Sequence, residues 1–211
     1  MMQQITIHDE HFSLDPTGAI FWHEQNMLMI ADVHFGKVAH FRKYGAAVPS
    51  RASSANYKKL AEAMERHNPD TICFLGDLFH STLNNEWRLF ETWAKNTMAK
   101  IILVSGNHDI ISPHKFEALG ISVSEGLKIT SFLLTHHPTE REGYFNFSGH
   151  IHPGINMQGT GRQSIKLACF YKKEHQLILP AFGNFTGKYI LHPSEKDTVY
   201  AIVDGEVICV S

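Results

Sequence analysis

The stretches TICFLGD at residues 71–77 and IILVSGNHD at residues 101–109 decide the fold that we predict for this chain. Each opens with a short aliphatic run, as buried strands do, and ends on a glycine followed by side chains that bind metals. A third aliphatic run ends just before an Asp-Val-His triplet. We therefore predict three buried strands, at Met27–Ala31, Thr71–Leu75 and Ile101–Ser105.

Two segments with helical periodicity separate these strands. Ser50–His67 places Leu60 and Met64 on one face, and Asn85–Ala99 repeats apolar residues such as Trp87 and Phe90 at helical spacing. The resulting order of strand, helix, strand, helix, strand implies parallel strands joined by right-handed crossovers.

The second half of the chain has a different pattern, in which strand-like runs follow one another without a long helix. Turns containing Gly, Asp or Pro separate them, which predicts a second, mostly antiparallel sheet packed on the first. The expected fold is a two-sheet α/β sandwich, parallel-rich in its first half, with residues 1–211 as a single domain. The runs are Ile121–Ser124, Leu127–Thr135, Tyr144–Ser148, Ile165–Tyr171, Gln176–Leu179, Thr198–Val203 and Glu206–Val210.

Composition excludes some classes of protein. The 211 residues carry 19 Lys and Arg against 21 Asp and Glu, a net charge of −2, so any nucleic-acid binding must use a local patch or a bound cation. Three widely spaced cysteines form no disulfide framework, and no stretch has the form of a signal peptide or a membrane helix. We therefore expect a cytoplasmic protein with no membrane partner.

Histidine is in excess, with 15 residues, which favours metal binding or acid–base chemistry. Seven histidines are interpreted as surface or turn residues without a functional role: His8, His11, His23, His67, His114, His175 and His192.

Metal-capable side chains follow five of the predicted strands. A lone Asp-x-His is expected about 0.6 times by chance, but Gly-Asn-His and Gly-His-x-His together are expected on the order of 0.002 to 0.004 times, so the set is specific. Open α/β sheets place their ligands at this carboxyl edge, and the glycines allow sharp turns there. The clusters are Asp32-Val33-His34, Gly76-Asp77, Gly106-Asn107-His108-Asp109, His136-His137 and Gly149-His150-Ile151-His152.

The donor atoms in these clusters are carboxylate and amide oxygens and imidazole nitrogens, without thiolates. Such sites suit Mn²⁺, Fe or Zn²⁺ and argue against a structural zinc site of the cysteine type. These donors exceed one tetrahedral set but suit two ions that share a carboxylate, and Asp77 on the middle strand is the natural bridge. Paired ions of this kind clamp a displacement at phosphorus.

From about residue 27 to residue 152, this order of motifs resembles the calcineurin-like metallophosphoesterase superfamily. The resemblance implies a first metal held by Asp32, His34, Asp77 and His152. It implies a second metal held by Asp77, Asn107, His136 and His150. The family pattern favours His136 in the His136-His137 doublet, and His137 stays open as the alternative. His108 would stabilise the transition state and protonate the leaving oxygen, and Asp109 would orient its imidazole.

Further motifs resemble one bacterial group, the DNA-ligase-associated metallophosphoesterases, described as DNA-damage-response endonucleases. The resemblance implies a phosphodiester substrate in DNA, a functional association with a DNA ligase and a helicase, and two divalent ions, with Mn²⁺ favoured over Fe, Zn²⁺ or Ni²⁺. It makes no prediction of the oligomeric state. The motifs are Phe35-Gly36-Lys37, Arg42 to Pro49, Gly76 to Ser81, Gly149 to Pro153 and Leu179 to Gly187.

Substrate contacts outside the metal ligands are less specific. Arg42, Lys43 and Arg51 form either a phosphate clamp or a solvated face, and His80 either contacts phosphate or bonds within its loop. For Phe182 and Phe185, an ordinary core turn is favoured over a base-stacking platform.

Two other functions stay open at this stage. The net charge favours a small-molecule phosphatase or a cyclic-nucleotide phosphodiesterase. A non-catalytic scaffold is the alternative of another class, but it would be expected to have lost metal ligands, and all seven are present.

Overall fold

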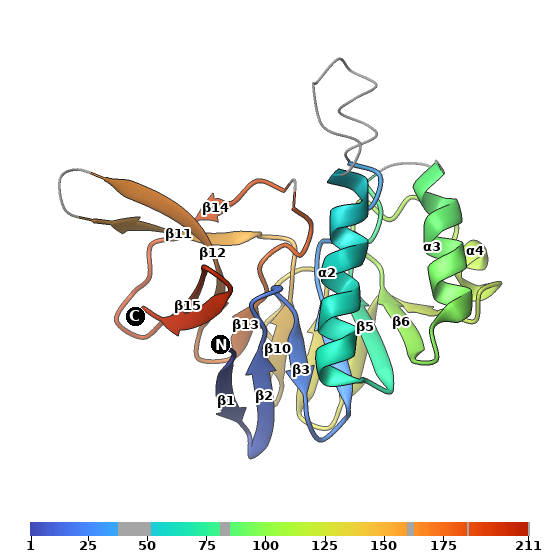
Figure 1. Cartoon of the computed structure of the whole chain (residues 1–211). Helices are drawn as coiled ribbons and strands as arrows, with labels where there is room; N and C mark the ends of the chain where they lie inside the picture. Colours follow the sequence, from blue (N-terminus) through green and yellow to red (C-terminus); the bar gives the residue numbers. More distant parts are fainter. Residues whose placement is uncertain (38–51, 81–84, 160–162, 185, 211) are drawn as a thin grey trace.

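The computed structural model of the chain describes residues 1–37, 52–80, 85–159, 163–184 and 186–210, and these form two stacked sheets with helices on one outer face (Figure 1). The α/β sandwich predicted from the sequence is thereby confirmed. Among the described residues, no helix is long and apolar enough to cross a membrane.

The first sheet is parallel in its middle and antiparallel at its N-terminal side. Strands β4, β5 and β6 run parallel to one another, as predicted, and β7 extends the parallel set, whereas β1 to β4 pair antiparallel. In sheet order, its strands are β1 (Gln3–Ile7), β2 (Glu10–Leu14), β3 (Ile20–Trp22), β4 (Met27–Ile30), β5 (Thr71–Leu75), β6 (Lys100–Val104) and β7 (Ser122–Ser124).

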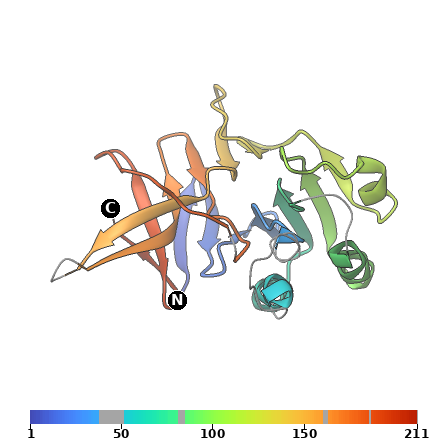
Figure 2. The same ribbon diagram turned by 90° about the horizontal axis from the view of Figure 1, so that it is seen from above.

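Helices α2 (Ala52–His67) and α3 (Asn85–Asn96) cover the outer face of this sheet, and a short helix, α4 (Pro113–Glu117), precedes β7. Figure 2 shows α2 and α3 on the same side of β5 and β6. Alternate residues of each central strand point to opposite faces, so Leu28 and Phe74 pack under the helices while Met29 and Cys73 face the second sheet. Burial on both faces explains why these strands are continuous apolar runs.

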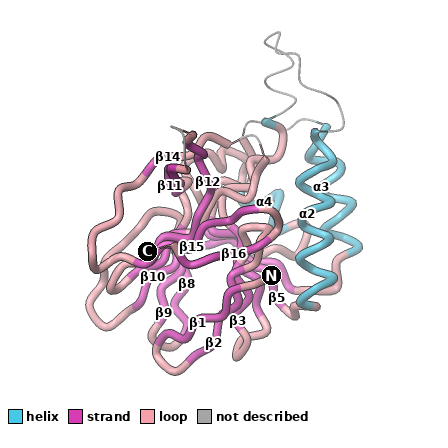
Figure 3. The backbone as a smooth tube through the Cα atoms, turned by 60° about the vertical axis from the view of Figure 1, so that its left-hand side comes forward, coloured by secondary structure: helices cyan, strands magenta, loops and turns pink. Residues whose placement is uncertain are grey.

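The second sheet is mostly antiparallel, but β9, β10 and β13 pair parallel, as do β11 and β14. It fills the side of the molecule away from the helices (Figure 3). Its strands are β8 (Gly126–Ile129), β9 (Phe132–Thr135), β10 (Phe145–Ser148), β11 (Pro153–Gln158), β12 (Ser164–Lys172), β13 (Gln176–Ile178), β14 (Tyr189–Ile190), β15 (Thr198–Val203) and β16 (Glu206–Cys209).

Two expectations about the second half were wrong. Ile121–Ser124 was expected in the second sheet, but β7 pairs parallel with β6 in the first. Leu127–Thr135 was expected as one strand, but it is part of a β8–β9 hairpin that turns at Thr130, where φ is 49°. Strands β1 to β3, β11 and β14 were not predicted: β3 and β14 are only three and two residues long, and β1, β2 and β11 lack a continuous apolar run.

Candidate metal centre

The ends of five strands bring the candidate ligands to one edge of the sandwich. Backbone hydrogen bonds link successive turns there: Asp32 N–H donates to Gly76 O at 3.2 Å and His34 N–H donates to Asp77 O at 2.9 Å. The two sheets are also joined at this edge, because Asp32 Oδ2 accepts the His150 N–H at 2.9 Å. The seven residues predicted as ligands therefore lie together, at the ends of β4, β5, β6, β9 and β10.

Asp32, His34 and His152 form the first group of converging donor atoms. The Asp32 carboxylate is fully buried, and its Oδ1 has no hydrogen-bond donor in the described residues but lies 3.3 Å from His152 Nε2. His34 Nε2 lies 3.4 Å from His152 Nε2 and 3.8 Å from Asp77 Oδ2. An orphaned carboxylate oxygen among imidazole nitrogens is an arrangement that a cation would satisfy.

The second group converges on His136 Nε2. This atom lies 2.9 Å from Asn107 Oδ1, 3.4 Å from Asp77 Oδ1 and 3.2 Å from His150 Nδ1. His136 Nδ1 is 2.9 Å from the Leu75 carbonyl, which can only accept, so the ring proton sits on Nδ1 and the Nε2 lone pair faces the group. A backbone carbonyl fixes metal-binding histidines in this way.

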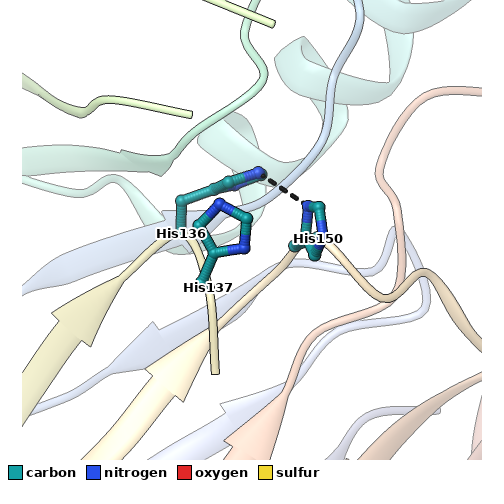
Figure 4. Close-up of side chains that lie close together, drawn as sticks. All are labelled: His136, His137 and His150. Atoms are coloured by element: carbon teal, nitrogen blue, oxygen red, sulfur yellow. Dashed lines mark hydrogen bonds between the residues drawn. The ribbon is translucent and has the colours of Figure 1, made fainter. Parts of the chain in front are cut away.

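The structure distinguishes the two members of the histidine doublet. The His136 side chain is buried and contacts both Asn107 and Asp77, whereas His137 is exposed. The His137 ring lies 4.1 Å, centroid to centroid, from the His150 ring, and Figure 4 shows the three imidazoles together. The geometry favours His136 as the ligand, with His137 close to it at the surface.

The electrostatic setting suits a bound cation. Burial lowers the pKa of His34 to about 2, and neighbouring charges, that of Lys37 first, add to the effect. Burial and the charge of His137 likewise lower the pKa of His150. A lowered pKa favours the neutral imidazole, which is the form that binds metals. Among the described residues, neither Asp32 nor Asp77 has a lysine or arginine within 4.0 Å.

Backbone strain is concentrated in this set. Positive φ angles are uncommon outside glycine and cost on the order of 1–3 kcal/mol each when the residue is poorly suited to them. Such strain persists only where the surrounding structure imposes it, and it clusters at functional sites. Five of the seven candidate ligands have positive φ: Asp32 (54°), His34 (51°), Asp77 (49°), His150 (67°) and His152 (52°).

The glycines of the motifs have two different roles. Gly76 has a φ of 82°, in agreement with the sharp turn predicted for it. At Gly106, an added Cβ would lie less than 3.0 Å from the Asp77 backbone nitrogen and Oδ1. At Gly149, it would lie less than 3.0 Å from Asp32 Oδ2. These two glycines allow close approach to the aspartates, a role that the sequence analysis did not anticipate.

His108 lies at the rim of the centre, with an exposed side chain. Its backbone N–H donates to Asp77 Oδ1 at 2.9 Å, and its ring centroid is 5.6 Å from that of His34. The half-buried His80 ring is stacked on it at 5.6 Å with an interplanar angle of 28°. Both imidazoles are therefore placed next to the candidate ligands without joining either donor group.

Asp109 does not orient His108 in this structure, contrary to the expectation. Its Oδ2 accepts the Gly106 N–H at 2.8 Å, and its Oδ1 accepts the N–H groups of Leu78 and Phe79 at 2.9 and 3.3 Å. No hydrogen bond joins the carboxylate to the His108 ring in the described residues. Asp109 instead ties the turn after β6 to the turn after β5, and burial raises its pKa to about 6.

The other expected substrate contacts are only partly testable. Arg42, Lys43, Arg51 and Phe185 lie outside the described residues. Phe182 is fully buried among the residues under the helices, so the core-turn interpretation is confirmed for it.

Sequence reasoning missed one cation near the centre. Lys37 is half-buried; burial lowers its pKa, while the charges of Asp32 and Asp77 act in the opposite direction. Lys37 belongs to the Phe35-Gly36-Lys37 motif of the resemblance, but the sequence analysis assigned it no role of its own, because no spacing rule makes a lysine three residues after His34 distinctive.

The chain is similar to known proteins in both sequence and structure. Residues 26–155 match the family described as calcineurin-like phosphoesterase. The nuclease MPE of Pseudomonas putida has a similar structure, with a TM-score of 0.82 and 26% identity over 100% of both chains. The phosphoesterase Yfce of E. coli is more distant, with a TM-score of 0.46 and 14% identity over 87% of this chain and 97% of its own. No curated protein sequence matches this chain significantly. Because the matched segment covers more than half of the chain and contains all seven candidate ligands, the chain belongs to the calcineurin-like phosphoesterase family of metal-dependent hydrolases.

Proposed function

We propose that this chain hydrolyses phosphodiester bonds in nucleic acid with two divalent ions bound at the described edge. The observation that carries this proposal is the position of Asp77 between the two groups of donor atoms. Its Oδ2 faces His34 Nε2 at 3.8 Å, and its Oδ1 faces His136 Nε2 at 3.4 Å. One carboxylate with an oxygen toward each group is the arrangement expected of a bridging ligand.

The proposed ligand sets are those implied by the sequence. Asp32, His34, Asp77 and His152 would hold the first ion, and Asp77, Asn107, His136 and His150 the second. Mn²⁺ is the proposed metal, with Fe, Zn²⁺ and Ni²⁺ as alternatives, because the donors are oxygens and imidazoles. When bound, such ions activate water as a nucleophile and offset negative charge on the phosphoryl oxygens.

The protein's own residues would supply the remaining chemistry. The His108 imidazole is exposed at the rim, where it can reach a substrate, and it would protonate the oxygen that leaves phosphorus. Its backbone is fixed by the hydrogen bond to Asp77 Oδ1. Asp109 would act as a positioning residue, because it holds the two turns that carry Asp77 and His108.

A nucleic-acid substrate is supported by the likeness to the P. putida protein, which is named a nuclease and is similar over its whole length. The motifs shared with the ligase-associated group extend the proposal to a functional association with a DNA ligase and a helicase in the cytoplasm. The net charge of −2 favours the second candidate, a small-molecule phosphatase or a cyclic-nucleotide phosphodiesterase.

A substrate panel tests the proposal. The Mn²⁺-loaded protein and a metal-free control are assayed on bis(p-nitrophenyl) phosphate, p-nitrophenyl phosphate, cyclic nucleotides, and single-stranded, nicked and gapped DNA. We expect a higher kcat/KM for the diester than for the monoester, cleavage of DNA, and no activity without metal. A preference for the monoester, or cleavage of cyclic nucleotides but not of DNA, would favour the small-molecule candidate instead.

A further inference from the structure

A small pocket borders the candidate metal centre at His152. It has a volume of about 170 Å³ and is lined by Lys59 of α2, by His152, and by Asn184, Thr186 and Lys188 of the segment between β13 and β14. None of its described lining residues is acidic. The pocket therefore has two lysines on its wall and no carboxylate to balance them.

Lys59 lacks a counter-ion in the described residues. Its ammonium group donates one hydrogen bond, to the Phe182 carbonyl at 2.8 Å, and lies 4.5 Å from the centre of the Phe182 ring. Burial lowers its pKa to about 8, although the more distant Asp15 and Glu62 act in the opposite direction. A partly buried ammonium with donors to spare favours an anion beside it.

Lys188 is held against the same pocket by the backbone around it. The next residue, Tyr189, donates its N–H to the His152 carbonyl at 2.9 Å and pairs with Pro153 in the parallel β11–β14 ladder. An added Cβ at Gly154 would lie less than 3.0 Å from the Lys188 Cβ, so the glycine lets the lysine backbone come close. The Lys188 side chain itself is exposed, and it can turn toward a ligand.

The pocket fits a small anion. Pockets that hold drug-sized molecules have volumes of roughly 300–1,000 Å³, so a volume of about 170 Å³ suits a single phosphate group better than a nucleoside. We propose that Lys59 and Lys188 bind the phosphate next to the scissile one in a nucleic-acid strand, so that this pocket adds a local cationic patch to a protein of net charge −2. This inference rests on the proposed function, because the neighbouring phosphate exists only in a polynucleotide.

Binding without catalysis tests the subsite directly. Fluorescence anisotropy measures the affinity of a labelled single-stranded oligothymidylate in EDTA at several salt concentrations. Lys59→Gln and Lys188→Gln are each expected to weaken binding about fivefold at low salt and to reduce the slope of log K against log salt by about 0.7, the value for one lost contact to single-stranded phosphate. Lys59→Arg, which keeps the charge, should retain most of the affinity.

Lys100→Gln is the matched control, because Lys100 is an exposed lysine at the opposite end of β6. It should bind the oligonucleotide as the wild type does. Lys59 packs on Phe182, so the thermal midpoint of Lys59→Gln is measured as well. If that midpoint falls, Lys188→Gln, which changes an exposed side chain, decides the question. Wild-type affinity in Lys188→Gln, or no binding by the wild type, would overturn the subsite.

Kinetic measurements distinguish a failure of this inference from a failure of the proposed function. With Mn²⁺, the loss of kcat/KM in Lys188→Gln should be at least about fivefold greater on single-stranded DNA than on bis(p-nitrophenyl) phosphate, which has no neighbouring phosphate. Equal losses on both substrates would contradict the subsite. A wild type inactive on both the nitrophenyl diester and DNA would refute the phosphodiesterase proposal, whereas the anisotropy measurement would still show whether the two lysines bind a nucleic-acid phosphate.

Discussion

Two fully buried aspartates, Asp15 and Asp32, lie in opposite electrostatic settings. Asp15 Oδ1 accepts the N–H and hydroxyl of Thr17 at 2.8 and 2.7 Å, and its Oδ2 accepts hydrogen bonds from Arg66 and from His67 Nε2. Asp32 has a backbone donor on Oδ2 but none on Oδ1, and its φ is 54°. The Asp15 carboxylate therefore accepts hydrogen bonds on both oxygens, whereas the Asp32 carboxylate, among the described residues, accepts them on Oδ2 only.

This difference separates a structural group from a candidate metal-binding group made of the same residue types. His67, expected on the surface, has a side chain only 5% exposed and links α2 to Asp15. His136 is also buried, but its Nε2 faces three other potential ligand atoms, Asn107 Oδ1, Asp77 Oδ1 and His150 Nδ1. Both groups contain Asp and His, so composition cannot distinguish them. The convergence of several potential ligand atoms on one point distinguishes the group around His136 from the group around Asp15.

The largest expected effect is a difference in hydrolytic activity between Asp77→Ala and Asp15→Ala. Asp77→Ala removes the carboxylate that faces both donor groups, so hydrolysis of bis(p-nitrophenyl) phosphate should fall by at least about 10³-fold. Asp15→Ala should retain activity per folded molecule within about threefold, because Asp15 contacts no candidate ligand. Comparable losses in both variants, measured on folded fractions, would remove the distinction.

His108→Ala tests a residue whose side chain joins neither donor group. General-acid catalysis contributes about 10²–10⁴-fold, so kcat should fall by about that factor on an alkyl diester while the metal content stays at the wild-type value. The nitrophenyl diester, whose phenolate leaves without protonation, should be affected much less. Steady-state kinetics on both substrates give the ratio, and equal losses would exclude the leaving-group role.

Gly106→Ala tests the close packing around Asp77. The added Cβ must displace the Asp77 backbone or carboxylate, so metal affinity and kcat/KM should each fall about 10- to 100-fold, the usual cost of misplacing a catalytic group by about 1 Å. Gly126→Ala is the control, because its added Cβ meets its nearest neighbours no closer than 3.4 Å. Metal titration of both variants makes the comparison, and near-wild-type affinity in Gly106→Ala would show that the aspartate has room to move.

The smallest expected effect concerns stability and pH at the satisfied aspartate. Burial alone would raise the pKa of Asp15, but hydrogen bonds from His67, Arg66 and Thr17 outweigh it and hold the pKa well below its usual value of 3.8. The stabilisation is therefore fully present above pH 3.8 and is lost as the pH falls toward the folded-state pKa. Asp15→Asn should be about 2–4 kcal/mol less stable at pH 7 and should lose less stability on acidification.

Urea unfolding of the metal-free wild type and Asp15→Asn between pH 7 and pH 2.5 measures both quantities. If the difference in stability between the two proteins stays constant over this range, Asp15 does not contribute through its charged form.

The sequence predicted that the candidate ligands lie at one edge of the sandwich, because the signals for their positions are local. Each cluster, such as Gly106-Asn107-His108-Asp109, directly follows an aliphatic run, and parallel strands bring such ends together without further information. The same reasoning correctly placed β4, β5 and β6 and the two helices between them.

Features that depend on distant partners were not predictable in this way. A three-residue strand such as β7 has no pattern that selects one sheet over the other; its place is set by pairing with β6. Asp109 bonds to the backbone of Leu78 and Phe79, about 30 positions earlier, rather than to its neighbour His108. His67 is buried by a turn that lies more than 50 residues before it.

Metal content is the most direct test of the contrast between the two aspartates. The wild type, Asp77→Ala and Asp15→Ala are saturated with Mn²⁺, freed of excess ion by gel filtration and analysed for metal per chain. We predict two ions on the wild type and on folded Asp15→Ala, and none retained by Asp77→Ala, since bound metal requires the shared carboxylate. Two ions retained by Asp77→Ala, or loss of both from folded Asp15→Ala, would contradict the central claim.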